Sequence, residues 1–218
     1  MTKPSWIKAK LNATLKKECT VARIIAGQAR GRKLAVPPTG TRPTSDRAKE
    51  GLFSSLQVRF GFVEKRVLDL FAGSGALGLE AASRGAATVV LVDNHKSAIS
   101  VIAANAQKIG HPDTRVVEAK ASTYVASAPR EFFDMVLADP PYDLSDEAVN
   151  EMVEALIPLL REGAVVVVER DTRSPEVAWP KGFTPTKQKL KRRTYGRTRM
   201  DIAVYSVGDI DSEEQLHD

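Results

Sequence analysis

The chain has 218 residues and 43% apolar content, which is enough for one main buried core with an appendage rather than two equal domains. Its apolar runs fall short of the roughly 20 residues of a membrane helix, and a single cysteine with three scattered histidines favours neither a disulfide nor a zinc site, so we expect a cytoplasmic protein without a bound metal. The net charge of +5 is unevenly spread, because residues 1–50 and 181–200 carry +9 and +8, whereas residues 51–180 and 201–218 carry −6 each.

The N-terminal part of the chain is expected to be an appendage in front of the main domain. Residues 1–20 are basic and lack a clear apolar period, which is typical of a disordered extension. Within residues 21–45, the segments R-I-I-A-G and R-K-L-A-V flank a turn rich in glycine and arginine, and they predict a small β-hairpin followed by a loop from Pro37 to Pro43. A helix is expected to begin at Thr44-Ser45-Asp46, with an apolar face formed by Ala48, Leu52, Phe53 and Leu56.

Residues 46–207 alternate short apolar runs with helix-length amphipathic stretches, and this pattern predicts a single larger domain. Five apolar runs predict strands at residues 67–71, 88–93, 115–119, 133–139 and 164–170. Helices between such strands are typical of a parallel sheet that is covered on both faces, and one of them is expected to follow Ser145, which can cap it. Two further strands, within 183–194 and 200–207, have no helix between them and should be antiparallel, and an acidic tail follows at 208–218. The prediction is an α/β fold with a seven-stranded, mostly parallel sheet.

A glycine-rich loop follows the first of these strands. The stretch D-L-F-A-G-S-G-A-L-G contains G-x-G-x-x-G at Gly73, Gly75 and Gly78, between a strand and a helix, and Asp93 ends the second strand. Glycines allow the backbone to approach a cofactor closely, and the carboxylate can bind ribose hydroxyls. A loop without a ligand, an NAD site and an S-adenosylmethionine site remain open. Asp69 favours the last, because its carboxylate would attract a cationic ammonium group and repel a pyrophosphate.

The fourth predicted strand ends in A-D-P-P-Y, residues 138–142. In an open α/β sheet, the carboxyl end of this strand lies at the edge where ligands bind. Asp139 and the Pro140 carbonyl, which the two prolines hold in place, could accept the two hydrogens of an exocyclic amine on a base and so free its lone pair for a methyl group. Tyr142 would stack on that base. A proline-stiffened loop with an exposed tyrosine is the structural alternative.

Three blocks of the sequence resemble one family. F-A-G-S-G-A-L-G-L-E-A followed by A-D-P-P-Y is similar to the class I S-adenosylmethionine-dependent methyltransferases that act on amino groups of bases. The preceding R-I-I-A-G-Q-A-R-G-R-K-L and R-P-T-S-D-R-A-K-E-G-L-F resemble the bacterial 16S ribosomal RNA guanine-N2 methyltransferases, and the match covers about Arg23 to Tyr205.

The resemblance implies a Rossmann-like domain that binds S-adenosylmethionine and RNA and methylates a guanine of 16S ribosomal RNA, as a monomer acting on the small ribosomal subunit or its precursor. It assigns catalysis to Asp139, Pro140, Pro141 and Tyr142, and it assigns cofactor binding to Asp69, Phe71, Gly73, Ser74, Gly75 and Asp93.

The chain departs from the family pattern after the third predicted strand. Where such enzymes carry Asn or Asp for the adenine amine of the cofactor, this sequence has Lys120-Ala121. A lysine side chain has no lone pair to accept that hydrogen bond. The adenine contact is therefore expected from the backbone of Ala121 or from elsewhere.

Basic residues on both sides of the acidic middle are the candidate RNA contacts. Phosphate contacts would position the RNA, whereas the pocket at Tyr142 and the shape of the RNA would select the base. The predicted contacts are Arg30, Arg32, Lys33, Arg42, Arg47, Lys191, Arg192 and Arg193. A solvated surface charge is the alternative for each. For the whole protein, three other functions remain: an adenine-N6 methyltransferase of DNA or RNA, a non-catalytic RNA-binding assembly factor, and a nicotinamide dehydrogenase.

Overall fold

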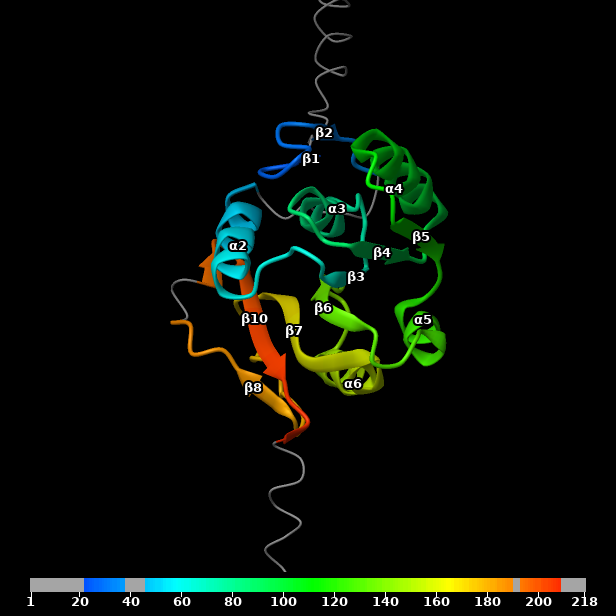
Figure 1. Ribbon diagram of the computed structural model, residues 1–218. Coiled ribbons are helices and arrows are strands. Elements are labelled where there is room, and N and C mark those ends of the chain that lie inside the picture. The colour runs from blue at the N-terminus through cyan, green and yellow to red at the C-terminus, as the bar shows by residue number, and fades with distance from the viewer. Residues whose placement is uncertain (1–21, 38–45, 190–192, 209–218) are drawn as a thin grey trace, which may run out of the picture.

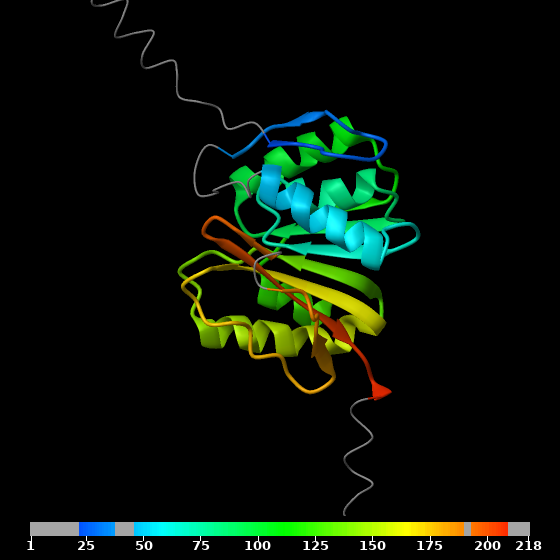
Figure 2. The same cartoon turned by 90° about the vertical axis from the view of Figure 1, so that its left-hand side faces the viewer.

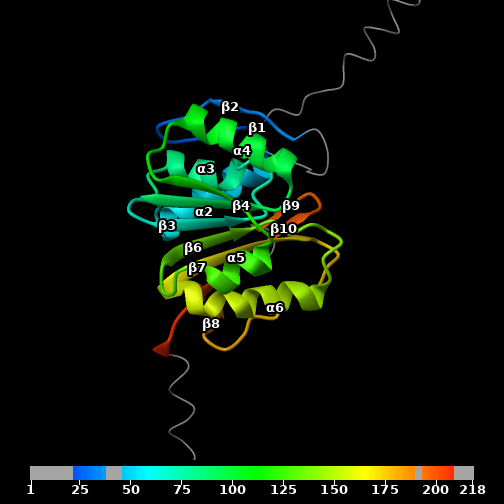
Figure 3. The same cartoon turned by 90° about the vertical axis from the view of Figure 1, so that its right-hand side faces the viewer.

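The computed structural model of the chain describes residues 22–37, 46–189 and 193–208. Within them, one mixed β-sheet lies between two layers of helices, and a two-stranded sheet lies outside one of these layers (Figures 1 and 3). Some predictions fall outside the described residues. These are the extension 1–20, most of the loop after Pro37 with Arg42, the helix start at Thr44-Ser45, Lys191, Arg192, and the acidic tail beyond Gly208.

The central sheet confirms the predicted α/β class. Its parallel strands, in spatial order, are β5 (Thr114–Glu118), β4 (Thr88–Asp93), β3 (Arg66–Leu70), β6 (Phe133–Ala138) and β7 (Leu160–Asp171). Antiparallel strands continue the sheet beyond β7, first β10 (Thr198–Tyr205) and then β8 (Phe183–Pro185), while the short β9 (Thr194–Tyr195) also pairs with β10. The strand order reverses between β3 and β6, and such a reversal creates the crevice in which open α/β sheets bind ligands.

Residues 183–194 do not form the single strand expected from the sequence. β8 ends at Pro185, whose ring nitrogen has no hydrogen to donate to a neighbouring strand, and regular pairing at this edge resumes only at β9. A second difference is the start of β7, which begins at Leu160 and not at the predicted residue 164. Gly163 adopts a φ of +76° inside this added part of the strand, close to where the register with β6 shifts.

Helices cover both faces of the sheet (Figure 3). One layer contains α2 (Asp46–Arg59), α3 (Ala76–Ser83) and α4 (Lys96–Ile109), and the other contains α5 (Ala121–Ser127) and α6 (Asp146–Leu156), which runs into the 3₁₀ turn η1 (Ile157–Leu159). Strand β7 buries Val165 and Val167 in the first core and Val166 and Val168 in the second, which explains its continuous apolar run. The predicted apolar face of α2 is buried, and the Ser145 hydroxyl caps α6 by accepting a hydrogen bond from the Ala148 amide at 3.2 Å.

The predicted N-terminal hairpin is present and lies on the outer side of the α3 and α4 layer (Figures 2 and 3). It consists of β1 (Ala22–Arg23) and β2 (Lys33–Leu34). Glu80 of α3 is fully buried, and its carboxylate accepts hydrogen bonds from the backbone amides of Ile25 at 2.7 Å and Ala26 at 3.0 Å. A buried carboxylate requires such partners, so the hairpin is fixed to the helix that follows the glycine loop.

Candidate active site

A large cleft opens at the carboxyl ends of the parallel strands, on both sides of the point where the strand order reverses. It has a volume of about 1410 Å³ and is bordered by the glycine loop after β3, the end of β4, the start of α5 and the turn after β6. Of the predicted cofactor and catalytic residues, the structure brings the following to the lining of this one cleft: Asp69, Phe71, Gly73, Ser74, Asp93, Ala121, Asp139, Pro140, Pro141 and Tyr142.

The glycine loop takes its shape from hydrogen bonds that the sequence pattern does not reveal. The Asp93 carboxylate accepts hydrogen bonds from the Gly73 amide at 2.9 Å and from the His95 amide at 2.8 Å, so it holds the loop as well as facing the cleft. Phe71 lies at φ +63°, a left-handed conformation that costs a side-chain-bearing residue energy and that clusters at functional sites. Gly75 does not line the cleft; at φ +77° it turns the chain into α3.

Asp69 is a buried carboxylate whose two oxygens differ in their surroundings. Its Oδ2 accepts a hydrogen bond from the Gly78 amide at 2.7 Å, and its Oδ1 is buried without a hydrogen-bond donor among the described residues. Burial, with a smaller contribution from the charge of Asp93, raises the pKa of Asp69 to about 7. A cationic group in the cleft would satisfy the buried oxygen and favour its ionised form, which suits the ammonium and sulfonium of S-adenosylmethionine and opposes a pyrophosphate.

The turn after β6 presents the D-P-P-Y segment to the same cleft. Asp139 is partly buried and follows directly after Ala138, the last residue of β6. Pro140 is buried, and Pro141 begins a tight turn in which its carbonyl accepts a hydrogen bond from the Leu144 amide at 3.0 Å. Tyr142 is 56% exposed, which is unusual for a large aromatic residue. A carboxylate, a fixed backbone and an aromatic ring therefore stand together at the mouth of the cleft.

Asn105 supports the glycine loop from behind the cleft lining, and the sequence did not single it out. It lies on α4 and is 2% exposed, and its amide nitrogen donates to the Ser74 carbonyl at 2.8 Å and to the Ala35 carbonyl at 2.9 Å. Its amide oxygen accepts from the Ala35 amide at 2.9 Å. Because Val36 and Pro37 also border the cleft, Asn105 joins the glycine loop to the segment that leaves the hairpin. An asparagine in an amphipathic helix pattern gives no sequence signal for this role.

The start of α5 lies beside the cleft, where the sequence departs from the family pattern. Lys120 is the residue that precedes the helix and Ala121 is its first residue, and both border the cleft. The prediction that the backbone of Ala121 contacts the adenine of the cofactor is compatible with this placement and stays a prediction.

The predicted RNA contacts divide into different environments. Arg30, Lys33 and Arg47 are exposed. The Arg32 guanidinium donates to the carbonyls of Lys108 and Ile109 at the end of α4, so part of its hydrogen-bonding capacity is used within the protein. The Arg193 side chain is only 13% exposed and is paired with Asp201 and Glu176, so its guanidinium is engaged within the protein. Its role as a phosphate contact stays a prediction.

The fold and the cleft define a class of protein. A parallel sheet with an antiparallel strand at its end, a glycine loop after the first strand, an acidic residue after the second and D-P-P-Y after the fourth are together the arrangement of a class I S-adenosylmethionine-dependent methyltransferase.

Comparisons with known proteins give the family. Residues 22–204 match the model of the family described as conserved hypothetical protein 95. The chain is 35% identical to ribosomal RNA small subunit methyltransferase D of Escherichia coli K12, over 77% of this chain and 84% of that protein, and equally 35% identical to the protein of the same name in Haemophilus influenzae, over 77% and 87%. The chain therefore belongs to this methyltransferase family, and it is an S-adenosylmethionine-dependent enzyme.

Solved structures agree with the assignment. A protein from Escherichia coli superposes with a TM-score of 0.72 at 32% identity, over 85% of this chain and 98% of that one. A magnesium protoporphyrin IX methyltransferase from Synechocystis PCC 6803, solved with bound S-adenosylmethionine, shares the fold with a TM-score of 0.58 at 14% identity, over 77% of this chain and 87% of that one.

Two further observations concern helices that could cross a membrane and groups of side chains that could bind a metal ion. In the parts of the chain that the structure describes, no helix has both the length and the apolar character needed to cross a membrane. Across residues 22–37, 46–189 and 193–208, no group of three or more histidine, cysteine, aspartate or glutamate side chains is placed to hold a metal ion.

Proposed function

We propose that the protein transfers a methyl group from S-adenosylmethionine to the exocyclic N2 amine of a guanine in 16S ribosomal RNA, in the small ribosomal subunit or its precursor. The observation that carries the proposal is that the Asp139 to Tyr142 turn borders the same cleft as the glycine loop and Asp69. The family relationship to proteins named ribosomal RNA small subunit methyltransferases supports the choice of RNA. We further propose that the protein acts in the cytoplasm as a monomer.

Asp139 and Pro140 would activate the amine. The lone pair of the guanine amine is delocalised into the ring, which makes the nitrogen a weak nucleophile. Acceptors at the Asp139 carboxylate and the Pro140 carbonyl would hold the two N–H hydrogens and draw the nitrogen towards a tetrahedral geometry, with its lone pair directed into the cleft. S-adenosylmethionine, when bound, supplies an electrophilic methyl group. The protein contributes orientation and a preformed electrostatic environment.

Tyr142 would hold the target base. A guanine inside a helix cannot reach the end of β6, so it must be turned out of its stack. The exposed ring of Tyr142 at the mouth of the cleft offers a surface on which the base can stack, an interaction worth about 1–3 kcal/mol in nucleic-acid complexes. The exposed residues Arg30, Lys33 and Arg47 would contact phosphates and position the RNA without reading its sequence.

The proposal is tested with small-subunit particles from cells that lack the enzyme and a tritiated cofactor. Wild-type protein should label the ribosomal RNA, and Asp139→Ala should lower the rate by about a hundredfold or more while it binds the cofactor and the RNA nearly as well. Glu154→Ala, which removes an exposed carboxylate from α6, is the control and should leave the rate unchanged. Absence of label from wild-type protein, or label on DNA alone, would overturn the proposal.

The same assay, with analysis of the methylated nucleoside, separates the remaining alternatives. A non-catalytic assembly factor would bind the particles and label nothing. An adenine-N6 methyltransferase would use the same D-P-P-Y turn but would give a different methylated nucleoside. Unchanged methylation by Asp139→Ala would remove this carboxylate from the mechanism.

A further inference from the structure

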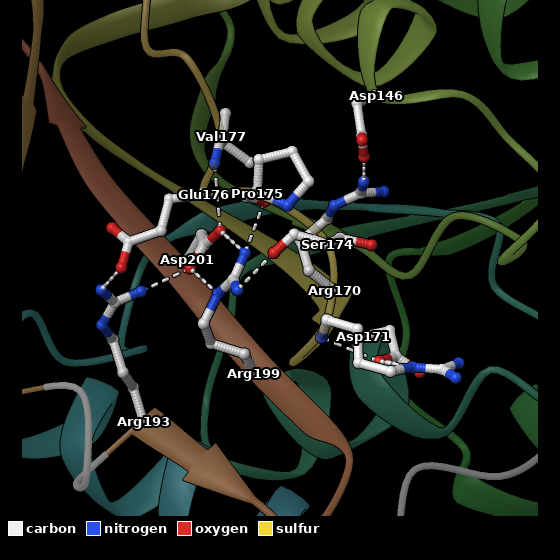
Figure 4. Close-up of polar contacts among 11 residues, drawn as sticks. Asp146, Arg170, Asp171, Ser174, Pro175, Glu176, Val177, Arg193, Arg199 and Asp201 are labelled. Carbon is white, nitrogen blue, oxygen red and sulfur yellow. Dashed lines mark hydrogen bonds and ion pairs between the residues drawn. The ribbon is translucent and has the colours of Figure 1, made fainter.

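A cluster of arginine and acidic side chains lies where β7 ends and β10 begins (Figure 4). Three of its arginines are buried against carboxylates. Arg199 is paired with Asp201, Arg193 with Asp201 and Glu176, and Arg170 with Asp146 at the start of α6, and their side chains are 5%, 13% and 6% exposed. This inner part of the cluster braces the loop after β7, because Arg199 also donates to the carbonyls of Ser174 and Pro175.

Two other arginines of the same region point outwards. Arg173 and Arg197 have side chains that are 76% and 61% exposed, and both are paired with Asp171, which is only 11% exposed. One carboxylate therefore serves two guanidinium groups and leaves a positive charge uncompensated at the surface. Hydrogen bonds from Arg173 hold the pKa of Asp171 well below its usual range, so that this carboxylate stays ionised.

The geometry of this pair is fixed before any ligand arrives. Arg173 donates from Nε to one Asp171 oxygen at 3.0 Å and from Nη2 to the other at 3.2 Å, and Arg197 donates from Nη2 at 3.1 Å. The loop after β7, which carries Arg173, and the turn before β10, which carries Arg197, are also joined by a hydrogen bond from the Thr172 amide to the Arg197 carbonyl at 2.9 Å. A guanidinium has five N–H donors, so several remain on each arginine for a second anion. Preorganised donors lose less conformational entropy when they bind.

The pair stands on the same edge of the sheet as the catalytic turn. Ala138 of β6 lies opposite Val168 of the neighbouring strand β7, so Asp171 lies three residues beyond this level, roughly 10 Å further along the strand direction. Tyr195 packs directly on Gly51 of α2, where an added methyl group would lie 2.3 Å from its hydroxyl oxygen. Arg47 is one helical turn before Gly51 on the same face, and it extends the basic surface towards α2.

We propose that Arg173 and Arg197, braced by Asp171, form a binding site for the phosphate backbone of the substrate RNA close to the target nucleotide. This inference rests on the proposed function and assigns a phosphate contact to Arg173 and Arg197, which the sequence pattern did not single out. The phosphates would lie against the outward donors of the two guanidinium groups, while the base turns towards Tyr142. Such contacts position the RNA and carry no sequence information.

The test combines Arg173→Gln and Arg197→Gln and measures RNA binding over a range of salt concentrations. Each lost phosphate contact on a single strand makes the slope of log affinity against log salt shallower by about 0.7, so the double variant should lose about 1.4 and bind at least tenfold more weakly at low salt. Cofactor binding and the rate at saturating RNA should change little. The matched control is Arg115→Gln, because Arg115 is 65% exposed and also paired with an aspartate, Asp113, on the opposite edge strand β5.

The outcomes are distinguishable from failure of the proposed function. If wild-type protein labels ribosomal RNA and the double variant has the salt slope of wild type and of Arg115→Gln, the phosphate site is refuted and the enzyme assignment stands. If wild-type protein labels no ribosomal RNA, the function itself fails. Arg173→Lys with Arg197→Lys keeps the charges and loses the fork geometry, so it should restore most of the salt slope. Equal unfolding midpoints in urea exclude misfolding as the cause of a loss.

Discussion

Asp69 is a buried carboxylate in the cofactor cleft, and burial together with the charge of Asp93 raises its pKa to about 7. This folded-state pKa lies above the ordinary value of 3.8, so the folded protein binds the proton more tightly than the unfolded chain. The stability that this group contributes is therefore fully present below about pH 4 and is lost as the pH rises towards 7 and beyond. A cationic ligand acts in the opposite direction, because it favours the ionised carboxylate.

We predict that S-adenosylmethionine binds more tightly as the pH rises from about 5.5 to about 7.5, and that Asp69→Asn removes most of this dependence. At the upper end of the range the variant should bind at least tenfold more weakly, and without cofactor it should be no less stable than wild type in urea. Calorimetric titration at several pH values measures the cofactor affinity, and Glu154→Gln, which changes an exposed carboxylate, is the control. An unaltered pH dependence in Asp69→Asn would show that this carboxylate does not face the cation.

Individual residues also show where sequence reasoning succeeds and where it stops. Asp69, Asp93 and Asp139 could be located because each lies within a recognisable strand or directly after one, beside a motif. Glu80 and Asn105 could not, because their partners in the hairpin segment lie 54 or more residues away along the chain. Arg193 was placed on the surface because a basic run looks the same in sequence whether it faces solvent or buried carboxylates.

Among the structural elements, the hairpin formed by β1 and β2 offers a direct test of how it is docked. Gly27 and Gly31 both have left-handed backbones, with φ of +85° and +80°. A Cβ at Gly27 would lie 1.8 Å from the Ser83 carbonyl oxygen of α3, whereas a Cβ at Gly31 would meet nothing within 4 Å. An alanine at either position would therefore carry similar backbone strain, but only at Gly27 would its side chain also collide with α3.

We predict that Gly31→Ala lowers the free energy of unfolding by about 1–2 kcal/mol, the cost of left-handed strain, and that Gly27→Ala costs more and displaces the hairpin from α3. Because the hairpin carries Arg30 and Lys33, Gly27→Ala should weaken RNA binding and leave cofactor binding nearly intact. Urea unfolding and RNA titration measure these changes. Equal effects of the two substitutions would contradict the docking contact at Ser83.

Helix α4 holds the second link between the hairpin segment and the glycine loop. Asn105→Ala removes three hydrogen bonds. It leaves the buried Ser74 carbonyl without its donor, at about 1–3 kcal/mol, whereas the backbone of the exposed Ala35 can turn to water. We expect lower stability in urea and weaker cofactor binding, because Ser74 belongs to the loop. Gln107→Ala, which shortens an exposed amide on the same helix, should change neither. Cofactor binding at the wild-type level in Asn105→Ala would show that the loop is held elsewhere.

The elements themselves were largely predictable. The continuous Val and Leu runs of β3, β4, β6 and β7 gave their positions, because strands buried on both faces need apolar side chains in both directions. The break after β8 differs from the single strand predicted within 183–194, although Pro185 cannot donate a backbone hydrogen bond and the segment K-Q-K-L that follows has no apolar alternation. Which face each helix covers depends on the crossovers and not on the periodicity of any one segment.

For the whole molecule, the uneven charge distribution gains a structural meaning. Part of the basic block at residues 181–200 is used inside the protein, since Arg193 and Arg199 pair with Asp201. Among the arginines described in this region, Arg197 and its neighbour Arg173 have exposed side chains, and we propose that they contact the RNA. A count of charges along the chain therefore indicates the partner better than it indicates the contacting residues.

The central claim is that the D-P-P-Y turn directs the N2 amine of a guanine towards the methyl group. It is tested most directly by mass spectrometry of nucleosides from small-subunit 16S ribosomal RNA, after incubation of particles that lack the modification with wild-type protein or Asp139→Ala. We predict N2-methylguanosine at one position with wild-type protein and at most a trace with Asp139→Ala. N6-methyladenosine, or an equal yield of N2-methylguanosine from both proteins, would contradict the claim.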